Sequence, residues 1–312
     1  MTFSGKINEE ISKIECDKIE SISELSGILC TNADIKLYSI RVQTENLNAA
    51  NRIFKIIKDT YDVTSNITVK KNYNFKKNEI YIIEIKKNVP EIIKDLGLIS
   101  ETGFKINEVP FDEIVADDNL KSAFIRGCFL IGGSINDPKT SRYHFELLIN
   151  NLKLAEFVKD ILNSYNLNSK VLRRKKGYMV YIKESEKISD LLRIIKAYNG
   201  VMYFEDIRIY RDKINMNNRI NNCEQANVEK SLASSNKQIA DINLLKESDA
   251  YDLLDDKIKQ VAEYRIKYPD SSLIELSEII SIETNSKITK SCVNHRLRKI
   301  KELADKIRTK NN

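Results

Sequence analysis

The sequence holds few residues that interrupt regular structure and few that could form a disulfide framework. Only four prolines and nine glycines occur among 312 residues, which favours helices and strands joined by short connections. The five cysteines are scattered without CxxC spacing, and their odd number argues against paired disulfides. We therefore interpret them as reduced packing residues.

Long apolar runs and charge of one sign are also scarce. No segment approaches the roughly 18 apolar residues of a membrane span, and residues 1–15 lack the apolar core of a signal peptide. These absences predict a cytoplasmic protein without a membrane partner. The 51 Lys and Arg against 45 Asp and Glu leave a net charge of only +6, so a polyanion-binding surface must come from local clustering.

Residues that usually carry catalysis are rare as well. The chain has two histidines, His144 and His295, and contains no HExxH, GxSxG, P-loop or clustered Cys/His spacing. His144 lies on a predicted strand, where a packing role is more common than a role as ligand or base. The sequence therefore predicts no catalytic residue, no metal site and no cofactor, and we expect a protein that is not an enzyme.

Two apolar helical runs contain glycines that need an explanation. Residues 121–138 carry Gly127, Gly132 and Gly133, and residues 24–35 carry Gly27 among other small residues. A glycine inside a helix costs about 0.5–1 kcal/mol relative to alanine, and close approach of another backbone is a common reason to keep it. We predict that these two helices pack together at the centre of one domain.

The segments after both helices align without a gap, which indicates an internal duplication. Residues 38–57 match residues 143–162, and each reads as an alternating strand followed by a helix with apolar i, i+3, i+4 spacing. Each copy then continues with a candidate hairpin and a closing helix. These are residues 66–87 and 90–98 in the first copy, and residues 169–183 and 186–198 in the second. One repeat is therefore helix, strand, second strand, helix, hairpin, helix.

The last third of the chain predicts helices alone. Residues 214–245 lack Pro and Gly and carry spaced apolar residues, which indicates one or two helices that connect domains. Residues 254–270 predict a helix ended by Pro269, and Ser271 or Ser272 can cap the next one. The loop over residues 281–288 that follows is longer than a usual helix-turn-helix turn.

The final predicted helix has the pattern of a DNA recognition helix. Thr289 is a good N-cap, and the buried spacing falls on Val293, Leu297, Ile300 and Ala304. Polar and basic side chains are left outward near its N-terminal half, where such a helix meets the major groove. The predicted DNA-binding residues are Lys290, Ser291, Asn294, His295, Arg296, Arg298 and Lys299.

Charge supports this interpretation. Residues 287–310 contain nine basic residues against Glu302 and Asp305, so this tail exceeds the net charge of the whole chain. An ordinary solvated helix with basic residues that complement its C-terminal dipole is the alternative. A second basic run, residues 173–176, falls at a predicted hairpin tip, where it is either a solvated turn or a phosphate-contacting loop.

Two motifs carry a resemblance to known families. A glycine-bearing central helix in each of two repeats resembles the LAGLIDADG homing endonucleases, whose helices meet at the two-fold interface of an α+β saddle. More closely, FIRGCFLIGGSINDP (residues 124–138) together with KSCVNHRLRKI (residues 290–300) resembles the bacterial WhiA family. Members of that family carry a LAGLIDADG-like platform and a helix-turn-helix domain.

The resemblance implies an α+β fold with a duplicated LAGLIDADG-like platform, followed by an all-α helix-turn-helix domain. We expect the platform over residues 1–213 with halves of about 1–110 and 111–213, a helical connection over 214–248, and the DNA-binding domain over 249–312. The implied function is sequence-specific DNA binding in cell division, chromosome segregation or sporulation-type transcription control. Expected partners are double-stranded DNA and, as candidates, RNA polymerase or other regulators.

The resemblance also locates the residues that a nuclease would need. The endonucleases place one acid from each central helix at the two-fold axis to hold divalent metal. Asn32 and Gly132 stand at those positions here, and Asp34 and Asp137 lie beyond them. We therefore expect no nuclease activity. A divergent metal-dependent endonuclease and an RNA- or protein-binding scaffold stay open as alternatives.

Overall fold

The computed structural model describes residues 1–72, 78–99, 106–140, 142–248 and 250–310. The chain divides into two compact units, Met1–Arg211 and Asp212–Asn312. Within the described ranges, no helix combines the length and the apolarity needed to cross a membrane.

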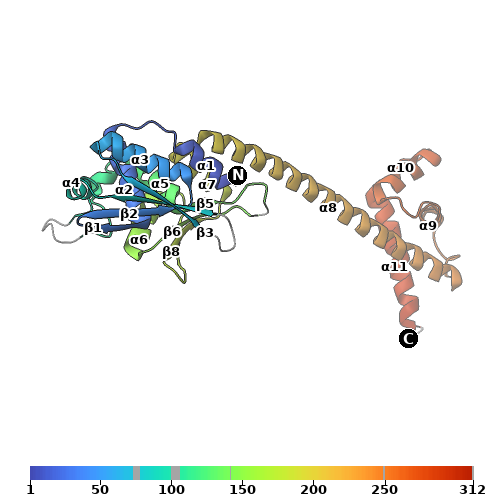
Figure 1. The fold of residues 1–312 in the computed structure, drawn as a ribbon. Coiled ribbons are helices and arrows are strands. Elements are labelled where there is room, and N and C mark those ends of the chain that lie inside the picture. The colour runs from blue at the N-terminus through green and yellow to red at the C-terminus, as the bar shows by residue number, and fades with distance from the viewer. Residues whose placement is uncertain (73–77, 100–105, 141, 249, 311–312) are drawn as a thin grey trace. The chain divides into compact units, whose positions relative to one another are not determined.

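The N-terminal unit contains the predicted repeat twice, after a short first helix α1 (Phe3–Ile11) (Figure 1). The first copy consists of α2 (Lys18–Asn32), β1 (Ala33–Lys36), β2 (Ser39–Thr44), α3 (Leu47–Tyr61), β3 (Asn66–Asn72), β4 (Asn78–Ile85) and α4 (Val89–Asp95). After the short helix η1 (Asp112–Val115), the second consists of α5 (Asp118–Gly132), β5 (Gly133–Ile135), β6 (Phe145–Ile149), α6 (Leu152–Ser164), β7 (Lys170–Arg173), β8 (Tyr178–Ile182) and α7 (Ser185–Ile194). The predicted order of elements is confirmed in both copies.

Some predicted boundaries were wrong. Residues 33–35 belong to β1 and not to the helix, and Gly132 is the last residue of α5, so Gly133 already begins β5. The central helices therefore end where the chain turns into the sheet. Tyr198, assigned to a closing helix, begins the following helix instead.

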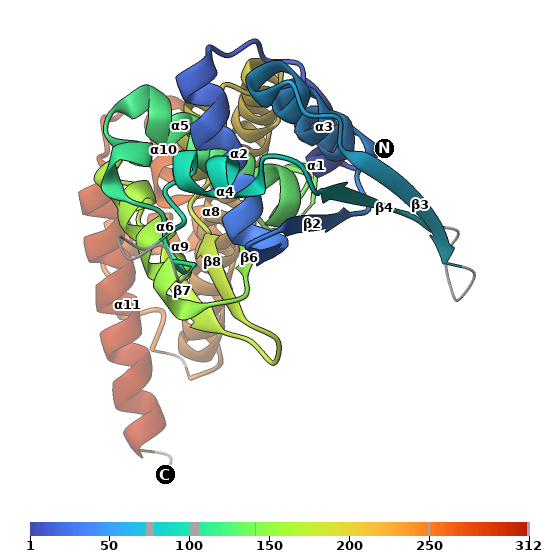
Figure 2. The ribbon, with the colours of Figure 1, turned by 60° about the vertical axis from the view of Figure 1, so that its left-hand side comes forward.

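Each copy forms a four-stranded antiparallel sheet with the same strand order, β1-β2-β4-β3 and β5-β6-β8-β7. Equivalent inner strands pair in equivalent register, since Val42 faces Ile83 and Leu147 faces Val180. All four side chains are buried, because alternate residues of each strand point to the helices. Helix α3 lies over the first sheet (Figure 2).

The central helices α2 and α5 touch through their glycines, as predicted. A Cβ at Gly127 would lie 3.0 Å from the carbonyl carbon of Glu24, and a Cβ at Gly27 would lie 3.0 Å from that of Phe124. In both cases the carbonyl oxygen would be nearer still. The contact is thus reciprocal between the repeats, and each glycine makes room for the backbone of the partner helix.

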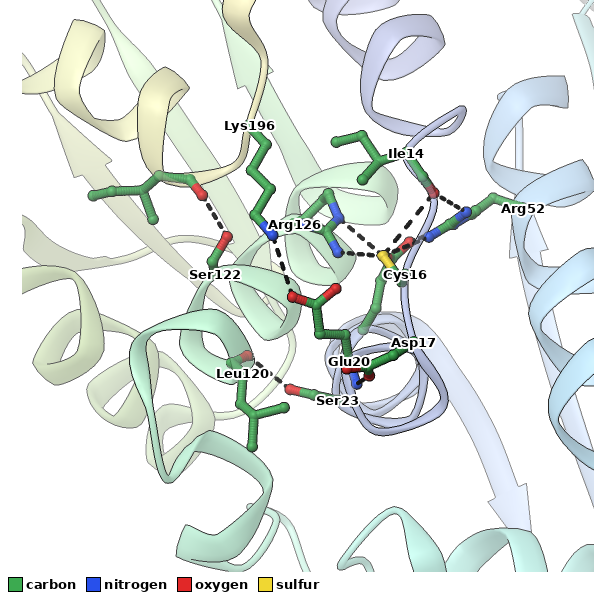
Figure 3. A network of polar contacts seen from close by, with 12 residues as sticks. Ile14, Cys16, Asp17, Glu20, Ser23, Arg52, Leu120, Ser122, Arg126 and Lys196 are labelled. Carbon is green, nitrogen blue, oxygen red and sulfur yellow. Dashed lines mark hydrogen bonds and ion pairs between the residues drawn. The ribbon is translucent and has the colours of Figure 1, made fainter.

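A buried ionic cluster joins the two repeats beside this contact (Figure 3). The Glu24 carboxylate is fully buried and accepts hydrogen bonds from Arg52 Nε at 2.7 Å and from Arg126 Nε at 2.9 Å. Cys16 Sγ lies between the guanidinium groups, 3.2 Å from Arg52 Nη2 and 3.0 Å from Arg126 Nη2. Burial raises the pKa of the Cys16 thiol. Because Arg126 comes from the second repeat, the cluster fastens the repeats together.

A single long helix, α8 (Tyr198–Glu247), runs from the N-terminal unit into the C-terminal one. The sequence predicted one or two helices over residues 214–245, and the structure has one that begins earlier. Its first N–H groups are satisfied by the Glu10 carboxylate, which accepts from Asn199 N at 2.7 Å and from Gly200 N at 3.0 Å. The remaining helices are α9 (Asp256–Lys267), α10 (Leu273–Glu283) and α11 (Lys290–Lys310).

Candidate nucleic-acid interface

The C-terminal unit packs α9, α10 and α11 around the end of α8 (Figure 1). Its core takes apolar side chains from all four helices, among them Ile242 and Leu245 of α8, which are fully buried. The buried face of α11 is the one that the sequence predicted: Val293, Leu297, Ile300 and Ala304. The last turns of α8 are thus part of the core that holds α11.

The start of α10 and the turn after it are fixed by hydroxyl groups. Ser272 is the N-cap, with Glu275 N donating to its hydroxyl at 3.2 Å, and the Glu275 carboxylate accepts from Ser272 N at 2.7 Å. Helix α10 extends to Glu283, so residues 281–283 are helical and the predicted loop over residues 281–288 was too long. The Ser281 hydroxyl donates to Ser277 O at 2.7 Å and accepts from Ile288 N at 2.9 Å, which holds the turn against α10.

A buried arginine connects three of these helices. Arg265 of α9 is almost fully buried and donates to Ser271 O at 2.6 Å and to Ser235 Oγ of α8 at 3.3 Å. Burial lowers the pKa of its guanidinium group. Because the hydrogen bonds span α8, α9 and the start of α10, Arg265 fixes how these elements meet.

The predicted DNA-binding residues lie in the N-terminal half of α11. Thr289 is the N-cap of this helix, and its hydroxyl accepts a hydrogen bond from Cys292 N at 3.3 Å. Five of the seven are exposed: Lys290, Ser291, His295, Arg298 and Lys299. Asn294 and Arg296 are half-buried on the two flanks of the helix. The expectation that Asn294 points outward needs correction, because it lines a groove beside α8. Nη1 of Arg296 is buried and finds no hydrogen-bond partner among the described residues.

That groove separates α11 from the end of α8 and has a volume of about 490 Å³. Its polar lining comes from both helices: Asn294, Arg298, Lys301 and Arg308 from α11, and Ser234, Lys237, Gln238 and Asp241 from α8. Asp241 Oδ1 lies 2.6 Å from Arg308 Nη2 across the far end, and this hydrogen bond raises the pKa of Arg308. Lys237 and Lys301 were not among the residues predicted from the sequence, and the pattern of α11 alone does not reveal that Lys237 of α8 lies across the groove.

The platform positions that would carry nuclease acids hold none. Asn32 is the last residue of α2, and its Nδ2 donates weakly to Gln43 O at 3.5 Å, while Gly132 ends α5. Asp34 lies 3.4 Å from Lys36 Nζ, and Asp137 Oδ1 accepts from Lys139 N at 2.9 Å. Within the described ranges, no three His, Cys, Asp or Glu side chains are grouped so that they could hold a metal ion.

Two other sequence candidates have clear places. His144 was predicted on a strand but immediately precedes β6, where its Nε2 lies 3.4 Å from Glu146 Oε2. The basic run over residues 173–176 forms the tip of the β7–β8 hairpin, as predicted, and all four side chains are exposed. Arg174 Nη2 lies 3.1 Å from Met179 Sδ.

Comparison with known proteins identifies similar chains over nearly the full length. Family models match residues 18–99 (WhiA N-terminal LAGLIDADG-like domain), 121–213 (WhiA LAGLIDADG-like domain) and 217–304 (WhiA C-terminal HTH domain). "Probable cell division protein WhiA" of Staphylococcus aureus (strain Newman) is 40% identical over 312 residues, covering 99% of this chain and 98% of that protein.

Solved structures agree with these matches. The crystal structure of full-length DUF199/WhiA from Thermatoga maritima is 25% identical with a TM-score of 0.59, covering 98% of this chain and 99% of that one. The crystal structure of the N-terminal LAGLIDADG domain of DUF199/WhiA is 27% identical with a TM-score of 0.50, covering 62% of this chain and 90% of that one. The predicted fold class is confirmed: an α+β LAGLIDADG-like part with two sheets, then a helical HTH region.

Proposed function

The chain belongs to the WhiA family, and on that premise we propose that it is a sequence-specific DNA-binding regulator without nuclease activity. One observation carries the proposal: α11 is N-capped, docked on its apolar face, and presents exposed polar and basic side chains along its first turns. The name of the Staphylococcus aureus relatives supports a role in cell division. Chromosome segregation and sporulation-type transcription control are the further processes that we propose.

The side chains of α11 divide into two kinds of contact. Ser291 and His295 are exposed one turn apart, so they share a face that can address base edges in the major groove. Lys290, Arg298 and Lys299 are long exposed cations suited to phosphates, and the half-buried Arg296 lies on the flank away from the groove. Asn294 lies between the outward face and the groove, so it can pair with adenine or with a backbone oxygen.

An anisotropy titration against specific and random duplexes at several salt concentrations tests this division. Asn294→Ala should cost about 1–3 kcal/mol at a specific site and leave random DNA nearly unaffected if Asn294 reads a base. Arg298→Ala should weaken binding to all sequences and reduce the salt slope by about one unit. Equal affinity of the wild-type protein for the two duplexes would contradict sequence-specific recognition. If removal of residues 250–312 left affinity unchanged, the helix-turn-helix would not be the DNA-reading part, and the basic hairpin over residues 173–176 would become the better candidate.

The alternative function is metal-dependent DNA cleavage. Asn32 and Gly132 supply no carboxylate pair where the platform would need one, which supports a protein that does not cut. Supercoiled plasmid incubated with the protein and Mg²⁺ or Mn²⁺ should therefore stay intact. Cleavage that disappears in Asp34→Ala or Asp137→Ala would favour a divergent endonuclease.

The domain boundaries and the protein partners also stay proposals. We propose a platform over residues 1–213, a helical connection over 214–248 and a DNA-binding domain over 249–312, with RNA polymerase or other regulators as partners. Side chains over residues 212–230 of α8 are exposed throughout, which supports a connection there. Limited proteolysis should cut this segment first, and early cuts elsewhere in the described ranges would argue for other boundaries.

A further inference from the structure

The groove between α8 and α11 contains more positive charge than its own carboxylate can balance. Arg308 is engaged by Asp241 at 2.6 Å and by Asp305 at 2.9 Å. Lys237, Arg298 and Lys301 also line the groove, and none has a carboxylate within ion-pair distance among the described residues. Three like charges in one groove repel one another, so the groove is suited to an anion.

Helix geometry explains why the charges converge. Asn294, Arg298 and Lys301 are spaced i, i+4, i+7, which places them on one stripe of α11. This stripe is a flank of the helix, between the exposed face of Ser291 and His295 and the buried face of Leu297. Lys237 meets the stripe from α8, on the other side of the groove.

Uncharged groups in the groove add hydrogen-bonding capacity. Oε1 of Gln238 is buried and has no partner among the described residues, whereas its Nε2 donates to Ser234 Oγ at 3.3 Å. A carboxamide nitrogen carries two N–H donors, so Gln238 Nε2 can also donate to an anionic oxygen. Asn294 has the same capacity on the opposite side of the groove.

Both sides of the groove are held in place before any ligand arrives. Ile242 and Leu245 anchor the end of α8 in the core, and the Arg308–Asp241 ion pair spans the far end of the groove. Ser235 of α8 accepts a hydrogen bond from the buried Arg265. A site whose parts are already positioned loses little conformational entropy on binding.

We propose that this groove binds a phosphate of the DNA backbone, with Lys237 of α8 and Lys301 of α11 as contacts beyond the seven predicted DNA-binding residues. The proposal rests on the function proposed above. A recognition helix in the major groove, which is about 12 Å wide, has a phosphate strand along each flank. When Ser291 and His295 face the bases, the flank with Arg298 and Lys301 faces one strand, and α8 adds Lys237 to it.

The test uses the full-length protein with Lys237→Ala, because this exposed side chain can be removed without disturbing the core. Affinity for specific and random duplexes should fall by the same factor, and the salt slope should fall by about 0.9. The ratio of wild-type to variant affinity should therefore shrink by about 3.5-fold when salt rises from about 50 to about 200 mM. Lys237→Arg should restore the slope, because it keeps the cation.

Lys246→Ala is the matched control. Lys246 is exposed and lies about two and a half turns further along α8, hence on the opposite face, so its removal should leave the slope unchanged. A variant at Lys237 that binds both duplexes like wild type, with the same slope, would overturn the groove proposal and leave the DNA-binding function standing. Failure of wild-type protein to bind any duplex would instead overturn the proposed function.

Inorganic phosphate distinguishes a site for free anions from one for DNA. The contrary outcome is that millimolar phosphate protects the wild-type protein but not Lys237→Ala against thermal unfolding, while DNA binding by the variant is unchanged. This pair of results would assign the groove to a small anion and overturn the proposal. We expect instead that phosphate at such concentrations gives no protection that depends on Lys237, because a duplex presents its phosphate together with the contacts of α11.

Discussion

Gly127→Ala should destabilise the N-terminal unit, although alanine is the better helix former. In a helix interior the substitution gains up to about 1 kcal/mol. Against this, the new Cβ would fall inside contact distance of the Glu24 backbone, 3.0 Å from its carbonyl carbon. Overpacking costs about 1–3 kcal/mol, and the upper end applies because a helix backbone cannot rotate away as a side chain can. The expected net loss is about 2 kcal/mol.

Thermal unfolding followed by circular dichroism measures this loss. For a domain of this size, about 2 kcal/mol corresponds to a fall in Tm of about 4–8 °C. Gly27→Ala should behave alike, because its Cβ would meet Phe124 in the reciprocal position. Lys121→Ala on the same helix is the control, since that side chain is partly exposed and its carboxylate partner is 3.9 Å away. An unchanged or higher Tm for Gly127→Ala would refute close packing of α2 and α5 at this residue.

Three further predictions concern packing and reactivity. Arg52→Met should lower the free energy of unfolding, measured in urea, by about 3–5 kcal/mol, because it removes one partner of a fully buried carboxylate. A loss below about 1 kcal/mol would mean that other groups balance the charge of Glu24. Ser272→Ala should lower the stability of the C-terminal unit by about 0.5–2 kcal/mol through loss of the cap on α10, and an unchanged midpoint would contradict the capping box. Burial raises the pKa of Cys128 to about 12, so in mildly alkaline solution Cys128 should resist a thiol reagent that modifies the exposed Cys223; equal rates for the two would contradict the packing.

The repeat was predictable because its signals are local. Strand alternation and helical spacing recur in both copies, and a glycine within an apolar helix already implies a close neighbour. The ends of the central helices were not predictable in the same way. Gly133 is compatible with a helix end or a strand start, and pairing with Leu147 in β6 makes it the first residue of β5. The strand pairing, and not the local preference of glycine, thus decides where α5 ends and β5 begins.

The buried ionic cluster could not be read from the sequence. Glu24, Arg52 and Arg126 are residue types that normally lie at the surface, and they come from three different helices. Their burial becomes tolerable only because each guanidinium donates to the same carboxylate, an arrangement that requires α2, α3 and α5 to be packed first. The cluster is therefore a consequence of the fold, whereas the glycines beside it are among its causes.

The same distinction separates the two parts of the candidate interface. The outward face of α11 follows from spacing within one helix, so the exposure of Ser291 and His295 could be predicted. The groove requires a second helix, and Lys237 is separated from Lys301 by a long stretch of chain that no local pattern bridges. Net charge was equally uninformative, because +6 averages a platform of mixed charge with a tail of nine basic residues. Where a polyanion binds depends on which cations lack partners, and in the described part of the C-terminal unit those of the groove are Lys237, Arg298 and Lys301.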